Sequence, residues 1–330
     1  GFPPEMTAGA VVSGAYFGDK MSPLSDTTNL APAMAGTDVM THVKFMLLPT
    51  GVTYAICVIA YGILGINYAN SGAAADMSAV YAMQDSITSL FNINPILLLP
   101  PVIVIVAVAM KMPAIPGITL GIITGAIVGM IFNGDTCTFG QILDAGMNGF
   151  TCESGNAAID DLLTSGGIMN MMYSVSLTMI AMMFGGIMEK TGLLAALVEK
   201  IVRLAKKPAS LVLTTELTCI LSNATMPEQY ISIVVPGRMY AETYKEMGLH
   251  PKTLSNALES SGTVTSALIP WNTCGVYILA TLGVSTFEYF PFALFNIIMP
   301  IMTVVMAYMG LTLAHMDGTR FASKKKNKAA

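Results

Sequence analysis

Residues 13–29 read SGAYFGDKMSPLSDTTN, which places two carboxylates, one ammonium group and six hydroxyls inside a longer apolar run. At the centre of a bilayer each of Asp19, Lys20 and Asp26 costs roughly 2.5–3.5 kcal/mol by insertion scales. Such charges persist in a membrane segment when they are paired, solvated in a cavity or bound to an ion. Pro23 removes a backbone donor in the middle of the run, and the carbonyls that it frees need partners. The stretch therefore predicts a broken membrane helix that lines an ion pathway.

The composition indicates an all-α polytopic membrane protein. Hydrophobic residues make up 54% of the 330 residues and charged residues 11%, whereas an average soluble domain is about one-quarter charged. The longest basic run, residues 324–328, follows the last apolar segment, where it indicates a cytoplasmic tail and not nucleic-acid binding. The five cysteines form no CxxC pair and the three histidines form no cluster, so we expect no cofactor and no structural metal.

The rule of about 20 apolar residues per crossing predicts a series of membrane segments. They are residues 6–35 (broken at Pro23), 45–66, 94–110, 113–132, 168–188, 253–284 (broken) and 291–314. The loops 67–93 and 133–167 contain acidic residues and no Lys or Arg, which places them outside. The turn at Lys111, the segment 190–207 and the tail contain Lys or Arg, which places them in the cytoplasm.

With this sidedness, residues 209–237 must enter and leave the membrane on the cytoplasmic face, because basic residues flank both ends. The two apolar arms, of about a dozen residues each, are too short to cross a bilayer. They are separated by SNATMPEQ, residues 222–229. Polar irregular backbone at membrane depth is tolerated only where protein or a water-filled cavity surrounds it. The segment is therefore predicted to be a re-entrant hairpin.

The order of elements predicts two inverted repeats. After the hairpin comes a crossing interrupted at residues 259–273, which read ESSGTVTSALIPWNT, and then an apolar helix. The start of the chain has the same order, and the loop charges give the two units opposite directions. Secondary transporters place their substrate and ion sites between such units. We interpret the chain as a single membrane transport domain. Residues 1–66 are the end of the first repeat, and residues 67–188 are connecting transmembrane helices. Residues 189–315 form the second repeat, and residues 316–330 form the basic cytoplasmic tail.

Three stretches resemble one transporter family: SGAYFGDKMSPLSDTTNLA (13–31), MPEQYISIVVPGRMY (226–240) and SGTVTSALIPWNTCGVY (261–277). They are similar to NhaC-type Na+/H+ antiporters, a family of the ion-transporter superfamily that also includes malate/lactate antiporters. The resemblance implies a non-enzymatic exchanger of the inner membrane, with Na+ and H+ as transported ions and a re-entrant hairpin and broken helix in each repeat. A homodimer is compatible with it. Because the first hairpin would precede Gly1, we expect that an N-terminal portion is missing.

The first broken crossing supplies oxygen ligands for a hard cation. They come from Asp19, Ser22, Ser25, Asp26, Thr27, Thr28 and Asn29. We expect Na+ to bind at Asp19, Asp26 and Asn29, with Asp26 as the first choice because it follows Pro23 in the break. There H+ and Na+ would compete for one carboxylate. Lys20 is expected to act as a counter-charge when the ion is absent. The alternative is that Asp19 or Asp26 caps the broken helix and pairs with Lys20.

The second unit supplies further candidates at the hairpin tip and at the second break. These are Asn223, Glu228, Gln229, Glu259, Thr263, Thr265 and Asn272. Glu228 and Glu259 are the candidate proton carriers. The alternative for both is an ion pair with Arg238 or Lys252 at the inner surface. Glycines recurring every fourth residue from Gly117 to Gly129 instead indicate a helix-packing face.

The leading hypothesis is Na+/H+ exchange by alternating access. A second is exchange coupled to a small mono- or dicarboxylate, which half-helix N-termini and Lys20 would hold. An ion channel and an inactive membrane fragment are the alternatives from other classes. A hydrolase is disfavoured, because the sequence places no Ser/His/Asp set at one membrane depth.

Overall fold

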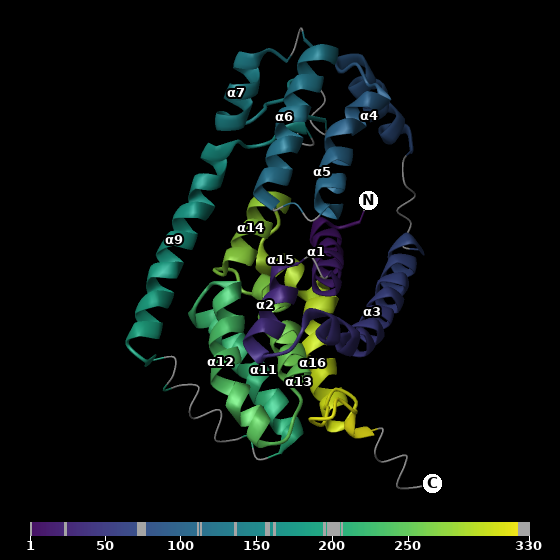
Figure 1. Ribbon diagram of the computed structural model, residues 1–330. Coiled ribbons are helices and arrows are strands. Elements are labelled where there is room, and N and C mark those ends of the chain that lie inside the picture. Colours follow the sequence, from purple (N-terminus) through teal and green to yellow (C-terminus); the bar gives the residue numbers. More distant parts are fainter. Residues whose placement is uncertain are drawn as a thin grey trace. The chain divides into compact units, whose positions relative to one another are not determined.

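The structure is a computed structural model that describes residues 2–22, 25–70, 77–110, 112, 114–134, 137–155, 159–160, 163–193, 196, 205 and 207–322. Within these residues every regular element is a helix, and β structure is limited to three isolated bridges. The chain divides into a core unit, Gly1–Ala73 with Ser174–Ala330, and a connecting unit, Ala74–Tyr173. The prediction of an all-α protein is confirmed for the described residues (Figure 1).

The core unit contains the broken crossings and the hairpin. Its α-helices are α1 (Pro4–Met21), α2 (Asp26–Ala35), α3 (Val39–Asn70), α11 (Pro208–Thr225), α12 (Gln229–Glu246), α13 (Pro251–Leu258), α14 (Thr273–Leu282), α15 (Thr286–Tyr289) and α16 (Leu294–Tyr308). Helix α9 (Ile168–Lys190) begins in the connecting unit and ends in the core unit. Helix α2 packs against α12, α13 and α3, and α11 packs against α12, α13 and α16. The polar segments of both predicted repeats therefore meet in one unit.

The first predicted break is confirmed by the helix bounds. Helix α1 ends at Met21 and α2 begins at Asp26, while Pro23 itself lies outside the described residues. Helix α2 then ends at Gly36, which adopts the left-handed conformation (φ 84°) that favours glycine at a helix C-terminus. The ten-residue α2 is a half-helix that starts beside the end of α1.

The second predicted break is also confirmed. Helix α13 ends at Leu258, a π-helical turn covers Glu259–Thr263, a 3-10 turn covers Ser266–Leu268, and α14 begins at Thr273. A π-helical turn leaves carbonyls without the usual i→i+4 partner and is frequent at functional sites. Outside the membrane segments, His250 caps the start of α13 by accepting the Lys252 N–H at 3.2 Å through Nδ1. Burial and the nearby Lys252 charge lower the pKa of His250, which keeps Nδ1 available as an acceptor.

The hairpin differs from the expectation in the length of its arms. Helices α11 and α12 pack on one another and are joined at Met226–Glu228, within the predicted tip, but each has 18 residues instead of about a dozen. At 1.5 Å per residue each arm is about 27 Å long. Arm length alone therefore does not exclude a crossing. The second half of α12 is polar, with Arg238, Glu242 and Lys245.

The last predicted segment, 291–314, is too long. The helical segment Thr286–Phe292, which is α15 with the following 3-10 turn, meets α16 at an angle of 57°, and α16 ends at Tyr308. The following chain turns back through bridges between Leu249 and His315 and between Ala314 and Arg320. Its polar contacts hold the described start of the tail against the core unit. Lys252 Nζ donates to the Gly318 carbonyl at 2.7 Å, and Arg320 donates to the Phe45 carbonyl at 3.1 Å.

Two described helices are long and apolar enough to cross a membrane, and a third results if α15 and α16 count as one bent span. The two are Val39–Tyr68 within α3 and Ile115–Phe132 within α6. The predicted crossing 94–110 begins instead as a 3-10 turn, Pro95–Leu98, that continues into α5 (Leu99–Ala109). Apolar helices of this kind indicate a membrane-embedded protein.

The connecting unit confirms the predicted glycine packing face. It contains α4 (Met77–Leu90), α5, α6 (Ala114–Phe132) and α7 (Phe139–Asn148). A Cβ atom on Gly121 would lie 2.4 Å from Val104 Cγ2, and one on Gly117 would lie 3.7 Å from the Ala107 side chain. The glycines of α6 therefore allow its close approach to α5.

The Gly9→Ala substitution in α1 is expected to destabilise the protein by about 1–3 kcal/mol. A Cβ there would lie 2.5–2.8 Å from the Phe292 Cβ, carbonyl carbon and oxygen, and backbone moves less readily than a side-chain end. Gly14→Ala in the same helix is the matched control, because a Cβ there meets nothing within 4 Å. Thermal unfolding in detergent should show a lower Tm for Gly9→Ala and an unchanged or higher Tm for Gly14→Ala. Equal Tm values for the two variants would contradict the packing of α1 on Phe292.

Candidate ion-binding site

Three ionisable side chains are buried in the centre of the core unit. Lys20 is at the end of α1, Glu216 is in the middle of α11, and Glu259 begins the π-helical turn; they are 0%, 2% and 0% exposed. Lys20 Nζ donates a hydrogen bond to Ser260 Oγ at 3.1 Å. The Lys20 charge also interacts with the carboxyl groups of Glu259, Glu216 and Asp19. The two broken segments are thus joined by one ammonium group and the carboxylates around it.

Thr27 lies between two carboxylates from the two breaks. Its hydroxyl is 3.2 Å from Asp19 Oδ2 and 3.2 Å from Glu259 Oε1, and Ser25 Oγ is 3.1 Å away. A hydroxyl has one proton and donates to one acceptor at a time. With both carboxyl groups ionised, Thr27 donates to one of them at a time; a proton on one carboxyl group, or a cation among the oxygens, would satisfy both. Glu259 Oε2, also buried, has no hydrogen-bond partner among the described residues.

Thr28, the neighbour of Thr27, closes the end of α1. Its hydroxyl lies 3.2 Å from the carbonyl oxygens of both Asp19 and Lys20 at the end of the broken helix, and the Asp19 carbonyl also accepts the Ser22 N–H at 3.0 Å. Thr28 is fully buried, Ser25 is buried and Ser22 is half-buried. Thr28 is therefore placed to satisfy the helix end.

Asp26 and Asn29 lie on the exposed face of α2, away from Thr27 and Thr28. Residues three apart share a helix face, so a helix that buries positions 27 and 28 presents 26 and 29 together on another side. The Asp26 carboxylate accepts hydrogen bonds from the Tyr230 hydroxyl and from the Thr27 N–H. The Asn29 amide donates to the Ser25 carbonyl at 2.6 Å. Of the expected Na+ ligands, the structure brings the half-buried Asp19 to the buried Thr27 hydroxyl and leaves Asp26 and Asn29 exposed.

Three carbonyls of the second break each accept a hydrogen bond from a side-chain amide of a different helix. Asn223 of α11 donates to the Gly262 carbonyl at 2.8 Å, Gln229 of α12 to the Thr263 carbonyl at 3.2 Å, and Asn296 of α16 to the Val264 carbonyl at 2.8 Å. Asn223 also donates to Thr265 Oγ1, and Asn272 donates to Asn223 Oδ1 while capping α14. These amides fix the shape of the break and occupy the carbonyls that an ion would otherwise bind.

The two candidate proton carriers, Glu259 and Glu228, differ in burial and in their contacts. Glu259 is fully buried, and its predicted alternative partner Lys252 bonds to Gly318 instead. Glu228 is half-buried at the N-terminus of α12, directly after the hairpin tip, where the Thr273 N–H donates to the Pro227 carbonyl at 3.0 Å. Only Glu259 of the two joins the cluster around Lys20.

Sequence reasoning missed Glu216, Ser260 and Tyr230. Glu216 is an isolated acidic residue in the apolar arm LVLTTELTCIL, residues 211–221, and an intramembrane carboxylate is by default a functional candidate. That signal could have identified it. Ser260 and Tyr230 have no comparable signal, because their roles come from contacts between segments more than 200 residues apart.

Comparisons with known proteins match most of the chain. A family profile described as the Na+/H+ antiporter family covers residues 14–311. The Na+/H+ antiporter NhaC of Alkalihalophilus pseudofirmus is 37% identical over 313 residues, 94% of this chain and 66% of the relative. The malate-2H+/Na+-lactate antiporter of Bacillus subtilis is 34% identical over 94% of this chain and 65% of its own length. The arginine/ornithine antiporter ArcD of Halobacterium salinarum is 31% identical over 100% of this chain and 68% of its own.

The chain spans about two thirds of the length of these curated relatives. The relatives are named as antiporters, not as enzymes. No solved structure matches the chain.

Proposed function

The chain belongs to the Na+/H+ antiporter family, and we propose that it exchanges Na+ for H+ across the cell membrane. One observation carries the proposal: a single hydroxyl, that of Thr27, lies between the carboxyl groups of Asp19 and Glu259 beside a buried Lys20. The same oxygens suit a proton or a hard cation. This is the arrangement that competition between H+ and Na+ requires.

In the proton-loaded form, one of the two carboxyl groups donates to Thr27 Oγ1, and the Thr27 hydroxyl donates to the other carboxylate. In the sodium-loaded form, that proton has left and Na+ takes its place among the oxygens of Asp19, Thr27 and Glu259. Lys20 stays with Ser260 and balances the carboxylates when neither ion is bound. Ser25 is close enough to contribute a further oxygen.

The proposal places ion binding at Asp19 and Glu259, and gives the other candidates supporting roles. Asp26 would fix α2 against α12 through Tyr230, and the amides of Asn223, Gln229 and Asn272 would hold the second break in shape. Thr263 and Thr265 belong to the second break, where Thr265 Oγ1 accepts from Asn223, and Glu228 precedes α12. Ser22 lies in the connection between α1 and α2, and Thr28 and Asn29 belong to the first turn of α2.

Alternating access between two inverted repeats is the mechanism that we propose for the exchange. It is supported by the contact of the two breaks: Thr27, from the first broken crossing, bonds to Glu259, from the second. Movement of one repeat against the other would open this contact to one side of the membrane at a time. The protein would lie in the inner membrane with its basic C-terminal tail in the cytoplasm, and a homodimer is a compatible assembly.

The re-entrant hairpin is tested by labelling single cysteines in a cysteine-free variant with a membrane-impermeant maleimide. Lys207→Cys and Glu246→Cys, at the exposed far ends of α11 and α12, should react from the cytoplasmic side. Thr225→Cys, beside the tip, should resist the reagent added outside, whereas the control Asp144→Cys, in the predicted outer loop, should react. Reaction of Thr225→Cys from outside at the rate of Asp144→Cys would show that the hairpin crosses the membrane.

Exchange itself is tested in everted membrane vesicles that contain a pH-sensitive dye. Addition of Na+ should release protons from acidified vesicles, and an equal concentration of K+ serves as the comparison. Proton release by malate or lactate in the absence of Na+ would instead favour the second candidate, carboxylate exchange. That candidate is raised by the similarity to the malate/lactate antiporter and by Lys20, which could pair with a carboxylate.

A further inference from the structure

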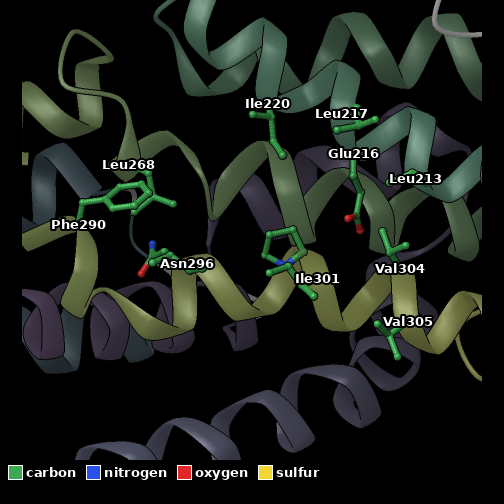
Figure 2. Close-up of a pocket in the computed structure, with 12 residues that line it drawn as sticks. Leu213, Glu216, Leu217, Ile220, Leu268, Phe290, Asn296, Ile301, Val304 and Val305 are labelled. Carbon is green, nitrogen blue, oxygen red and sulfur yellow. The ribbon is translucent and has the colours of Figure 1, made fainter. Parts of the chain in front are cut away.

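A groove of about 410 Å³ runs between α11 and α16 in the core unit (Figure 2). Leu213, Leu217 and Ile220 of α11 form one wall, and Pro300, Ile301 and Val304 of α16 form the other. Leu268 and Phe290 lie at the end where Asn296 is found. The volume and the apolar lining fall in the range of sites for small organic molecules, which commonly lie between the helices of a bundle.

Two buried polar side chains line this apolar groove. Glu216 extends from α11 toward α16, and its Oε1 has no hydrogen-bond partner among the described residues (Figure 2). Asn296, fully buried on α16, donates its amide to the Val264 carbonyl at 2.8 Å, so its Oδ1 is left as an acceptor, and Oδ1 also has no partner among the described residues. A buried acceptor without a donor is costly, so a donor from a bound molecule would be favourable at both positions.

We propose that this groove binds an amphiphilic organic cation, with its ammonium group at Glu216 and its apolar body between α11 and α16. The groove presents acceptors and no donor at these two positions, which suits a molecule whose polar group carries N–H bonds. A carboxylate or phosphate offers acceptors and would leave Glu216 Oε1 and Asn296 Oδ1 without donors. A lipid acyl chain would fill the apolar walls but leave Glu216 Oε1 and Asn296 Oδ1 unsatisfied.

The site is distinct from the proposed ion site, although both are adjacent to Lys20. The Glu216 carboxylate interacts with the Lys20 charge, but it is not among the oxygens that surround the Thr27 hydroxyl. The inference goes beyond Na+/H+ exchange and is measured without transport. Its success or failure is therefore independent of the proposed function.

The experiment compares two probes of nearly equal size, 4-phenylbutylammonium and 4-phenylbutan-1-ol, by equilibrium binding to the purified protein in detergent. The ammonium probe should bind saturably, with a Kd about tenfold or more below that of the alcohol. Glu216→Gln should weaken binding of the ammonium probe by about tenfold and change the Kd of the alcohol by less than about twofold. Val304→Trp, which fills the groove without changing charge, should weaken binding of both probes.

Glu242→Gln is the matched control, since Glu242 is an exposed carboxylate of α12 that pairs with Lys245 at 3.6 Å. It should bind both probes as the wild type does. If the wild type bound the two probes with equal affinity, this result alone would overturn the proposal. It would indicate that the groove holds an apolar occupant such as a lipid chain. Unchanged binding of the ammonium probe by Glu216→Gln, or non-saturable binding that Val304→Trp does not alter, would also overturn it.

Discussion

Glu259→Gln is expected to reduce Na+-dependent proton movement by about 100-fold or more, because it removes one of the two carboxyl groups that share the Thr27 hydroxyl. The amide keeps the shape of the side chain but cannot release a proton or offer a charged oxygen to Na+. The substitution also removes one of the carboxyl groups that interact with the Lys20 charge. The measurement is the rate of internal pH change after Na+ addition to proteoliposomes that contain equal amounts of folded protein.

Glu242→Gln provides the control for this variant as well, because its carboxylate is exposed and pairs with Lys245 of the same helix. It should exchange at the wild-type rate. A Tm measurement separates loss of exchange from loss of folding, since breaking a buried charge cluster also lowers stability. Exchange by Glu259→Gln at more than about half the wild-type rate would show that Glu259 does not couple the two ions. The exposed Asp26 would then be the next candidate for the coupling carboxylate.

Thr27→Val is expected to slow exchange by about 10- to 100-fold, the effect of losing a hydrogen bond to a charged group. Valine has nearly the volume of threonine, so the α2 backbone and its packing on α13 should persist. Without the hydroxyl, the Asp19 and Glu259 carboxyl groups have no shared donor and Na+ loses a ligand oxygen. The initial rate of proton movement at several Na+ concentrations gives both the apparent Na+ affinity and the maximal rate.

Thr281→Val is the control for Thr27→Val. Thr281 is exposed on α14, and its hydroxyl donates only to the Tyr277 carbonyl in the same helix. Its replacement should leave both the affinity and the maximal rate unchanged. If Thr27→Val retained wild-type apparent affinity for Na+, the hydroxyl would be a packing feature of α2 and not part of the ion site.

The two breaks could be predicted because their signals are local. Charged and hydroxyl residues in an apolar run, together with glycine and proline, disfavour a continuous helix, whatever the segment contacts. The structure confirms both interruptions, the second as a π-helical turn from Glu259 to Thr263. The glycine face of α6 was predictable for the same reason, since a four-residue period of small side chains is itself a packing surface.

The arrangement of the site could not be predicted, because it depends on helix phase and on distant contacts. The sequence offered seven oxygen-bearing residues between Asp19 and Asn29 without showing that Thr27 and Thr28 point inward and Asp26 and Asn29 outward. That choice is made by the packing of α2 on α12 and α13. Likewise, nothing in the second break showed that amides from α11, α12 and α16 would take up its free carbonyls.

The predicted length of the hairpin arms was wrong, because each arm has 18 residues instead of about a dozen. Polar residues were taken to end the first hairpin arm, yet α11 continues through Asn223, which donates to the Gly262 carbonyl, and Thr225, which donates to the Leu221 carbonyl of its own helix. Thr215 bonds to Tyr244 and Thr218 to Tyr240 across the hairpin. Hydropathy measures transfer to lipid, whereas these residues are transferred to a polar interior between two helices.

The most direct test of the central claim is equilibrium binding of radioactive sodium to the purified protein at a series of pH values. If Na+ and H+ compete for the oxygens of Asp19, Thr27 and Glu259, the apparent Kd for Na+ should increase by about tenfold for each unit by which the pH is lowered below the pKa of the site. Above that pKa, the apparent Kd should not depend on pH. Glu259→Gln should lose saturable Na+ binding, and Asp26→Asn should retain it with the same pH dependence. Na+ binding that is independent of pH, or that is lost in Asp26→Asn and kept in Glu259→Gln, would contradict the account.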